Sequence, residues 1–188
     1  SGAIFGTTWN LTYLNAPEGV ARDQVEKAVV GAFAVVDDSM NNYRSDSTIS
    51  RLNALEAMTV FEVDWDFALV FNTAFEIYIA TEGAYDPSVS PLVNLWGFGP
   101  DGVTEKPSRD ALEALEPIVG LEEFAWDLST RAFVKKNAKS ELDFSSIAKG
   151  YAVDLAADAL IELGVTDFML EVGGEIQTKG LSPRGDRW

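Results

Sequence analysis

The segment ELDFSSIAKGYAVD, residues 141–154, combines side chains that could bind a charged ligand. Asp143 and Lys149 stand in a run that is otherwise mostly apolar or small, where a charge is costly unless it has a partner. Ser145 and Ser146 between them offer hydroxyl and carbonyl oxygens. The pattern predicts a strand that ends near Asp143 and a helix that begins near Ser145. The free backbone N–H groups of such a helix end favour an anion such as a phosphate.

The position of Lys149 favours a ligand over a purely structural role. A cation in the first turn of a helix opposes the helix dipole, so it does not help the helix itself. A structural interpretation nevertheless stays open, in which Asp143 caps the helix and Lys149 pairs with it.

Two other segments have residues suited to binding. Residues 83–102, GAYDPSVSPLVNLWGFGPDG, form a predicted long loop, where Tyr85 and Asp86 precede a stiffening Pro87. Its aromatic rings offer faces for a flat ligand, or else they plug the core. In residues 39–53, SMNNYRSDSTISRLN, Tyr43 lies at a predicted helix end, which could equally be ordinary capping.

Composition limits the partners that this chain can have. Its net charge of −16 disfavours nucleic acid and anionic membranes, although an acidic surface alone can simply be a solvated one. The 188 residues contain no cysteine and no histidine, so they offer no thiolate, no Ser-His pair and no imidazole ligand. Any metal that they bind should be a hard cation held by oxygen, such as Mg²⁺ or Ca²⁺.

The elements that must position these residues mix helices and strands without a regular βαβ rhythm, which predicts an α+β fold. A chain of 188 residues with 47% hydrophobic residues suggests a single domain over 1–188, with two lobes as a possibility. The predicted strands are TTWNLTYLN, a hairpin of EFAWDL and RAFVKK, SELDF, and two strands joined by the glycines of EVGGEI.

Five helices are predicted from apolar periodicity and end signals. The first follows Glu18 and ends near residues 41–43, with an apolar stripe made of Val25, Val29, Ala32, Phe33, Val36 and Met40. The others begin after a cap at Ser47, at Asp64 or Asp66, and at Ser108. A further helix runs from about Ser145 to Leu163, with a predicted buried face of Ala148, Ala152, Leu155, Ala159 and Leu163.

The motifs FGTTW, SMNNYRSDSTISRLN, GAYDPSVSPLVNLWGFGP, LDFSSIAKGYAVD and VGGEIQTKG occur in an order and at separations that closely resemble the ApbE family. Members of this family are FAD:protein FMN transferases, formerly called thiamin biosynthesis lipoproteins. The resemblance covers nearly the whole chain. It implies an ApbE-like, T-fold-related fold of mixed antiparallel sheets with flanking helices.

The resemblance also implies a reaction. Family members bind FAD and Mg²⁺, and they transfer FMN to a threonine or serine of a partner flavoprotein with release of AMP. The acceptors are typically subunits of sodium-pumping or electron-transfer complexes. Proteins of the family are expected in the periplasm, anchored to the inner membrane by a lipid on the precursor. No base that activates the acceptor hydroxyl, and hence no catalytic residue, can be assigned.

Site residues carry over from the family motifs. Ser146 matches a metal-binding position, with its carbonyl oxygen as the expected ligand. Phe5 stands where many members have methionine, and Ser88 stands where threonine is more usual. The positions that match FAD contacts are Phe5, Tyr43, Ala84, Tyr85, Asp86, Asp143 and Lys149.

The family pattern continues beyond the final RGDRW, so we expect that the chain is a C-terminally truncated form. The later segment of the family supplies a histidine-containing motif and the Asp and Thr that complete the metal site. The 188 residues alone are therefore expected to be inactive in transfer. Two other functions stay open: a flavin-binding module without transferase activity, and a structural lipoprotein fragment that binds nothing.

Overall fold

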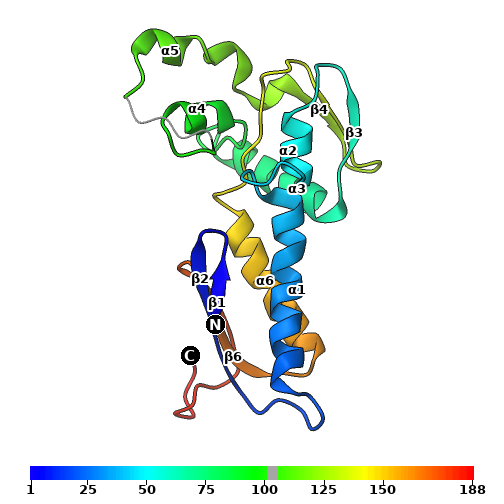
Figure 1. The fold of residues 1–188 in the computed structure, drawn as a ribbon, viewed down its shortest axis with the longest axis vertical. Helices are drawn as coiled ribbons and strands as arrows, with labels where there is room; N and C mark the ends of the chain where they lie inside the picture. Colours follow the sequence, from blue (N-terminus) through cyan, green and yellow to red (C-terminus); the bar gives the residue numbers. More distant parts are fainter. Residues whose placement is uncertain (101–105) are drawn as a thin grey trace. The chain divides into compact units, whose positions relative to one another are not determined.

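The computed structural model describes residues 1–100 and 106–188 (Figure 1). The helical elements are α1 (Arg22–Met40), α2 (Thr48–Asn53), α3 (Trp65–Ala80), α4 (Ser90–Leu95), α5 (Arg109–Glu113), α6 (Ala148–Glu162), and the short 3₁₀ turns η1 (Glu116–Ile118) and η2 (Leu121–Glu123). The strands are β1 (Gly2–Ile4), β2 (Thr7–Leu14), β3 (Val60–Glu62), β4 (Phe124–Asp127), β5 (Ala132–Lys135), β6 (Asp167–Val172) and β7 (Glu175–Lys179). The chain divides into two compact units, residues 1–37 with 147–188, and residues 38–146.

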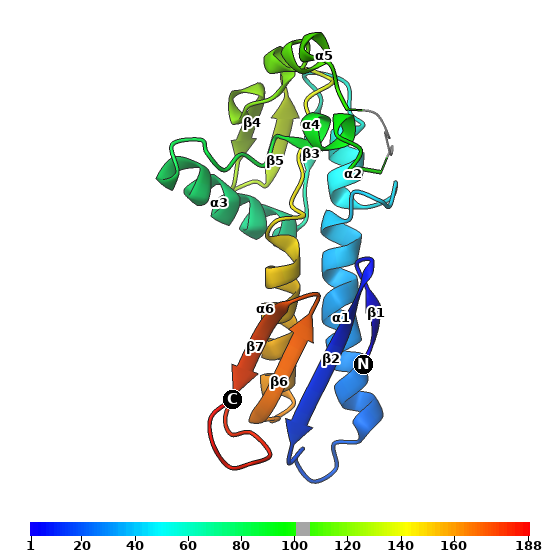
Figure 2. The ribbon, with the colours of Figure 1, turned by 90° about the vertical axis from the view of Figure 1, so that its left-hand side faces the viewer.

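The first unit contains an antiparallel sheet of order β1-β2-β6-β7. Helices α1 and α6 cover one face of this sheet (Figure 2). The predicted strands of this unit are confirmed, and the glycines of EVGGEI form the two-residue turn between β6 and β7. Gly173 is required there, because its φ is +56° and an added Cβ would lie 2.8 Å from Thr7 Cγ2.

The buried face of α1 is the predicted one, whereas that of α6 is not. The predicted stripe of α1 is buried at every position. On α6 the buried residues are Ala152, Val153, Ala156, Ala157 and Leu160, so only Ala152 of the predicted set is fully buried. The predicted and the observed stripes lie next to each other on the helix and both consist of alanine and other apolar residues, so periodicity alone does not choose between them.

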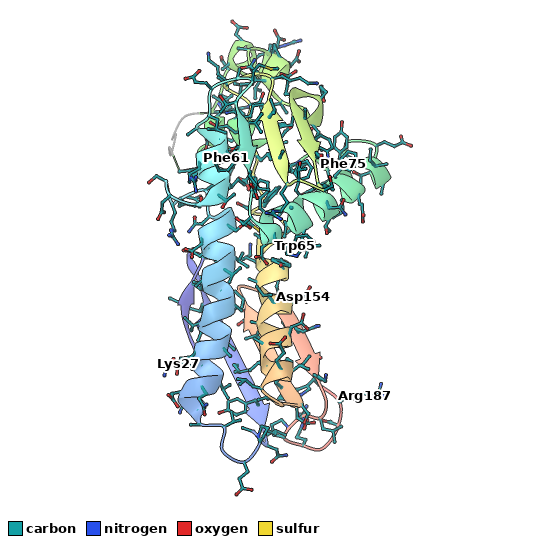
Figure 3. The ribbon with its side chains drawn as sticks, turned by 90° about the vertical axis from the view of Figure 1, so that its right-hand side faces the viewer. Lys27, Phe61, Trp65, Phe75, Asp154 and Arg187 are labelled. Carbon is teal, nitrogen blue, oxygen red and sulfur yellow. The ribbon has the colours of Figure 1, made fainter. Side chains whose placement is uncertain are left out.

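The second unit contains an antiparallel sheet of order β3-β5-β4, with the predicted hairpin of β4 and β5. Helix α3 packs against it through aromatic rings: Phe71 lies 4.7 Å from Phe133 of β5, and Phe75 lies 5.0 Å from Trp126 of β4, measured between centroids (Figure 3). Phe67 of α3 also packs on Phe144 at 5.0 Å, which places the residue after Asp143 in the core.

Three helix starts follow the predicted capping residues. Ser47, Asp64 and Ser108 each accept a hydrogen bond from a backbone N–H three residues later. Asp64 does more than cap α3, because its two carboxylate oxygens also accept hydrogen bonds from Ser39 and Thr48 at 2.9 and 2.5 Å. It therefore joins the C-terminal end of α1, the start of α2 and the start of α3.

Three predictions near the candidate site are wrong. SELDF is not a strand: the segment makes only an isolated parallel bridge between Val89 and Glu141. Residues 83–100 of the predicted loop include helix α4, and the last two residues of that loop, 101–102, lie outside the described residues. The helix predicted to begin near Ser145 begins at Ala148.

The α+β class and the mixed antiparallel sheets are confirmed. The division into two compact units leaves the single-domain interpretation of residues 1–188 a prediction. In the part of the chain that the structure describes, no helix is both long enough and apolar enough to cross a bilayer.

Candidate functional site

Tyr85 and Ser146 are brought together although 61 residues separate them. The Ser146 hydroxyl donates a hydrogen bond to the Tyr85 hydroxyl at 3.3 Å. Tyr85 follows the end of α3, where Gly83 adopts a φ of +81° and lets the chain turn. Ala84 is exposed and Tyr85 is half-buried, so this contact between the two motifs lies near the protein surface.

The electrostatic surroundings of Tyr85 include two predicted site residues. Burial raises the pKa of the Tyr85 phenol above its ordinary value, and the negative charges of Asp143 and Asp86 raise it further, while Ser146 opposes the shift. A carboxylate disfavours a nearby phenolate by like-charge repulsion. Asp86 and Asp143 therefore both lie close enough to Tyr85 to affect its titration.

The Tyr85 titration provides a test of this arrangement. Asp143→Asn should lower the pKa of Tyr85, because the phenolate loses a repelling neighbour, and Asp86→Asn should lower it by a smaller amount. The measurement is the absorbance change of tyrosine ionisation, with Tyr85→Phe subtracted to isolate this residue. An unchanged titration in Asp143→Asn would contradict the placement of that carboxylate.

Asp86 belongs to a buried turn whose hydrogen bonds use a single carboxylate oxygen. Oδ1 of Asp86 accepts from the backbone N–H of Ser88 at 2.8 Å and from its hydroxyl at 2.6 Å. The Ser88 oxygen in turn accepts from the N–H of Gly120 at 2.6 Å. Ser88 is fully buried, so its hydroxyl is a structural link between Asp86 and the segment at Gly120.

Asp143 lies beside the Asp86 turn through the backbone. The N–H of Asp143 donates to the carbonyl of Pro87 at 2.8 Å. Its carboxylate Oδ1 accepts from the N–H of Ser145 at 2.6 Å and so shapes the turn before α6. The helix cap at Asp143 that the structural interpretation allowed is therefore not formed: Asp143 shapes a local turn, and the N-cap position of α6 is Ile147, an apolar residue.

Tyr43 has a different partner. Its hydroxyl donates to the carbonyl of Phe98 at 2.9 Å, and its N–H donates to Asn41 Oδ1 at 2.8 Å. The Tyr43 side chain is 67% exposed and Phe98 is also exposed, so these rings remain accessible to a ligand. The described contacts thus link Tyr43 to the loop that carries Phe98.

Phe5 and Lys149 belong to the other compact unit, and their part in the site stays a prediction. Phe5 has a φ of +51° and Gly6 a φ of +71°. A two-residue hairpin turn of type I′ requires a positive φ at both of its central residues. Its ring packs edge-on against Phe33 at 6.1 Å between centroids. Lys149 is the second residue of α6 and is half-buried.

The described residues match Mg²⁺ in ligand type but do not assemble a metal site by themselves. Asp143 and Ser146 offer the oxygen donors that this ion prefers. Across residues 1–100 and 106–188, no three His, Cys, Asp or Glu residues gather in a way that could hold a metal ion. Ser146 as a metal ligand therefore stays a prediction.

Sequence reasoning missed the residues that hold Asp143 in place, above all Asn53 and Lys135. Asn53 is the last residue of α2, and its side-chain amide bonds to the backbone of Leu142, 89 residues away. Lys135 is fully buried. An asparagine at a helix end is common, and a single lysine in a predicted strand gives no sign that it is buried. Neither residue therefore carries a sequence signal for this contact.

A profile of the ApbE family matches residues 5–188. The chain is 36% identical over 189 residues to the FAD:protein FMN transferase of Vibrio cholerae, and 35% identical over 193 residues to that of Haemophilus influenzae. Each alignment covers 100% of this chain and 56% of the relative. The chain therefore spans a little over half the length of these relatives.

Solved structures agree with these similarities. The flavin transferase ApbE from Vibrio cholerae superposes with a TM-score of 0.94 at 36% identity, over 100% of this chain and 60% of that one. The apo form of the Pseudomonas stutzeri flavinyl transferase ApbE has a TM-score of 0.91 at 34% identity, over 100% and 62%. The predicted ApbE-like arrangement of sheets and helices is confirmed by these superpositions.

Proposed function

Because this chain belongs to the ApbE family, we propose that the protein containing it transfers FMN from FAD to a hydroxyl group of a partner flavoprotein. The observation that carries the proposal is the match over residues 5–188, together with relatives named FAD:protein FMN transferase at 36% and 35% identity. Since the chain spans 56% of those relatives, the activity is proposed for the complete protein.

The proposed reaction is a phosphoryl transfer. The acceptor threonine or serine oxygen forms a bond to the FMN phosphorus of FAD, the bond from that phosphorus to the bridging oxygen breaks, and AMP leaves with that oxygen. The acceptor proton passes to a base that is still to be identified. Mg²⁺, when bound, would neutralise part of the pyrophosphate charge, as metal ions do in other phosphoryl transfers.

The chain's own residues have complementary parts in this proposal. Lys149 lies in the first turn of α6, where its ammonium suits a phosphate oxygen. The ordinary pKa of a tyrosine phenol already lies well above neutral pH, and burial raises the pKa of Tyr85 further, so its hydroxyl is a hydrogen-bond donor at neutral pH. Tyr43 offers an exposed ring on which a flat ring system can stack.

The acceptors that we propose are flavoprotein subunits of sodium-pumping or electron-transfer complexes. A periplasmic location, with a lipid anchor on the precursor, belongs to the same proposal. Both rest on the family resemblance alone.

Calorimetric titration of the complete protein with FAD in the presence of Mg²⁺ tests the first step. We expect binding at micromolar concentrations, and a folded sample that releases no heat would contradict the proposal. Incubation with FAD, Mg²⁺ and an acceptor protein, followed by a denaturing gel, tests the second. A fluorescent acceptor band is expected with Mg²⁺ and not without it, whereas FAD binding with no such band would support a flavin-binding module instead.

Ser146→Ala should keep most of the transfer activity. The proposed metal ligand is the carbonyl oxygen of Ser146, which the substitution retains. Its hydroxyl makes one long hydrogen bond to Tyr85, and a neutral bond of this kind contributes about 0.5–1.5 kcal/mol. Transfer rates at saturating Mg²⁺ should therefore fall by less than about tenfold. A loss of about a hundredfold with weaker Mg²⁺ binding would instead assign the hydroxyl to the metal.

A further inference from the structure

The segment that carries Asp143 is held from several sides by residues to which the family resemblance assigns no role. We call residues 138–143 the clamped segment. Asn53 donates from Nδ2 to the carbonyl of Leu142 at 2.9 Å and accepts at Oδ1 from the N–H of Leu142 at 2.8 Å. One side-chain amide thus satisfies both backbone groups of a residue that is fully buried.

Asn53 is itself anchored by Lys135. The Lys135 ammonium donates to the carbonyl of Asn53 and, at 2.7 Å, to the carbonyl of Ala138. The Asn53 carbonyl belongs to the last turn of α2, where carbonyls lack helical partners and a cation is favourable. A fully buried lysine therefore joins the end of α2 to the first residue of the clamped segment.

The other side of the clamped segment faces the Asp86 turn. Glu141 makes the parallel bridge with Val89, and its carboxylate accepts from Ser90 at 3.1 Å and from Asn94 at 3.3 Å. The Asp143 N–H reaches the carbonyl of Pro87. The segment therefore lies between α2 and the turn that carries Asp86.

We propose that Asn53, supported by Lys135, is a positioning residue of the flavin site, because it fixes Asp143 next to the Asp86 turn. The proposal rests on the proposed function for the identity of the ligand. Asp143 has little freedom along the chain, since Leu142 before it is clamped and Phe144 after it is packed on Phe67. Without Asn53, the two buried backbone groups of Leu142 would lose their partners, and the segment would shift to find others.

The test uses the complete protein with Asn53→Ala and Asn53→Asp. Aspartate keeps the acceptor for the Leu142 N–H but turns a carboxylate oxygen toward the Leu142 carbonyl. We expect each variant to raise the dissociation constant for FAD about tenfold or more, because a displacement of about 1 Å is enough to disturb a site on this scale. Lys135→Met should show a smaller effect in the same direction.

Matched variants separate positioning from general stability. Val70→Ala removes a buried side chain of α3 in the same compact unit and should lower the melting temperature without weakening FAD binding. Asn72→Ala removes an amide that bonds to Glu76 on the exposed surface, and Lys106→Met repeats the charge change of Lys135→Met on an exposed lysine outside the clamped segment. Both should bind FAD as the wild type does.

A second readout needs no flavin. If Asn53 fixes Asp143, a crystal structure of Asn53→Ala should show the Asp143 N–H displaced from the carbonyl of Pro87, while Val70→Ala should keep that hydrogen bond. A wild-type protein that fails to bind FAD would refute the proposed function, yet the crystal structures would still decide the positioning role. Destabilised Asn53 variants with unchanged FAD affinity and an undisplaced Asp143 would overturn the inference. If Asn53→Ala does not fold, Asn53→Asp and Lys135→Met decide it by the same two measurements.

Discussion

Lys149→Ala in the complete protein should weaken FAD binding by about 10- to 100-fold, because a charge-assisted contact to a phosphate contributes roughly 1.5–3 kcal/mol. Stability should change little by comparison. Lys149 is the second residue of α6, where its positive charge opposes the helix dipole, so the helix gains slightly when the charge is removed. Calorimetric titration with FAD gives the affinity, and thermal unfolding gives the stability.

Lys179→Ala is the matched control, since it removes the same charge from an exposed position on β7. It should bind FAD as the wild type does, which separates a specific contact from the loss of one positive charge in a strongly acidic chain, whose 188 residues carry a net charge of −16. A lowered melting temperature in Lys149→Ala with unchanged FAD affinity would establish the structural interpretation of this lysine instead.

Ser88→Ala should destabilise the protein by about 1–3 kcal/mol, since it leaves the buried N–H of Gly120 without its acceptor. The substitution also removes the hydroxyl that donates to Asp86, so FAD affinity should fall as the turn loosens. Chemical denaturation of the wild type and the variant measures the difference in the free energy of unfolding.

Two controls sharpen the Ser88 experiment. Ser88→Thr keeps the hydroxyl and should restore FAD affinity to near the wild-type value, in line with threonine being the more usual family residue. Ser129 makes the same pair of bonds to Asp127 Oδ1 on an exposed turn, at 2.9 and 2.7 Å, and among the described residues its oxygen accepts no bond like that from Gly120. Ser129→Ala should therefore cost clearly less than Ser88→Ala, and equal costs would show that the link to Gly120 is unimportant.

Elements with strong local signals could be predicted from the sequence. The caps at Ser47, Asp64 and Ser108 each accept a hydrogen bond from a backbone N–H three residues later, so both partners lie in one short stretch of sequence. The stripe of α1 is equally clear, because its apolar and polar faces differ strongly. Motif order predicts the Tyr85-Asp86 pair and the Asp143 motif as parts of one site; the structure places Tyr85 in contact with Ser146, and their role in binding FAD stays a prediction.

Elements that depend on distant partners could not be predicted. SELDF has the composition of a strand, but the side chain of Asn53 takes the place of a neighbouring strand, 89 residues away. Helix α4 has only six residues and contains Pro91 in its first turn. It is too short for an apolar periodicity that would distinguish it from a loop. The buried Lys135 ammonium donates to the backbone carbonyls of Asn53 and Ala138, and no residue type marks such acceptors in a sequence.

The division of the chain also has a consequence for synthesis on the ribosome. Residues 38–146 form one continuous compact unit, whereas the other unit combines residues 1–37 with 147–188. Strand β2 must wait for β6, as the Asn10 bond to Glu171 spans 161 residues, and such distant pairing is slow. Since compact units tend to fold as they emerge, the inserted unit can complete its core while the N-terminal segment still lacks its sheet neighbour. During that interval β2 exposes the strand edge that β6 later covers, and an uncovered edge of this kind can pair with another chain and aggregate.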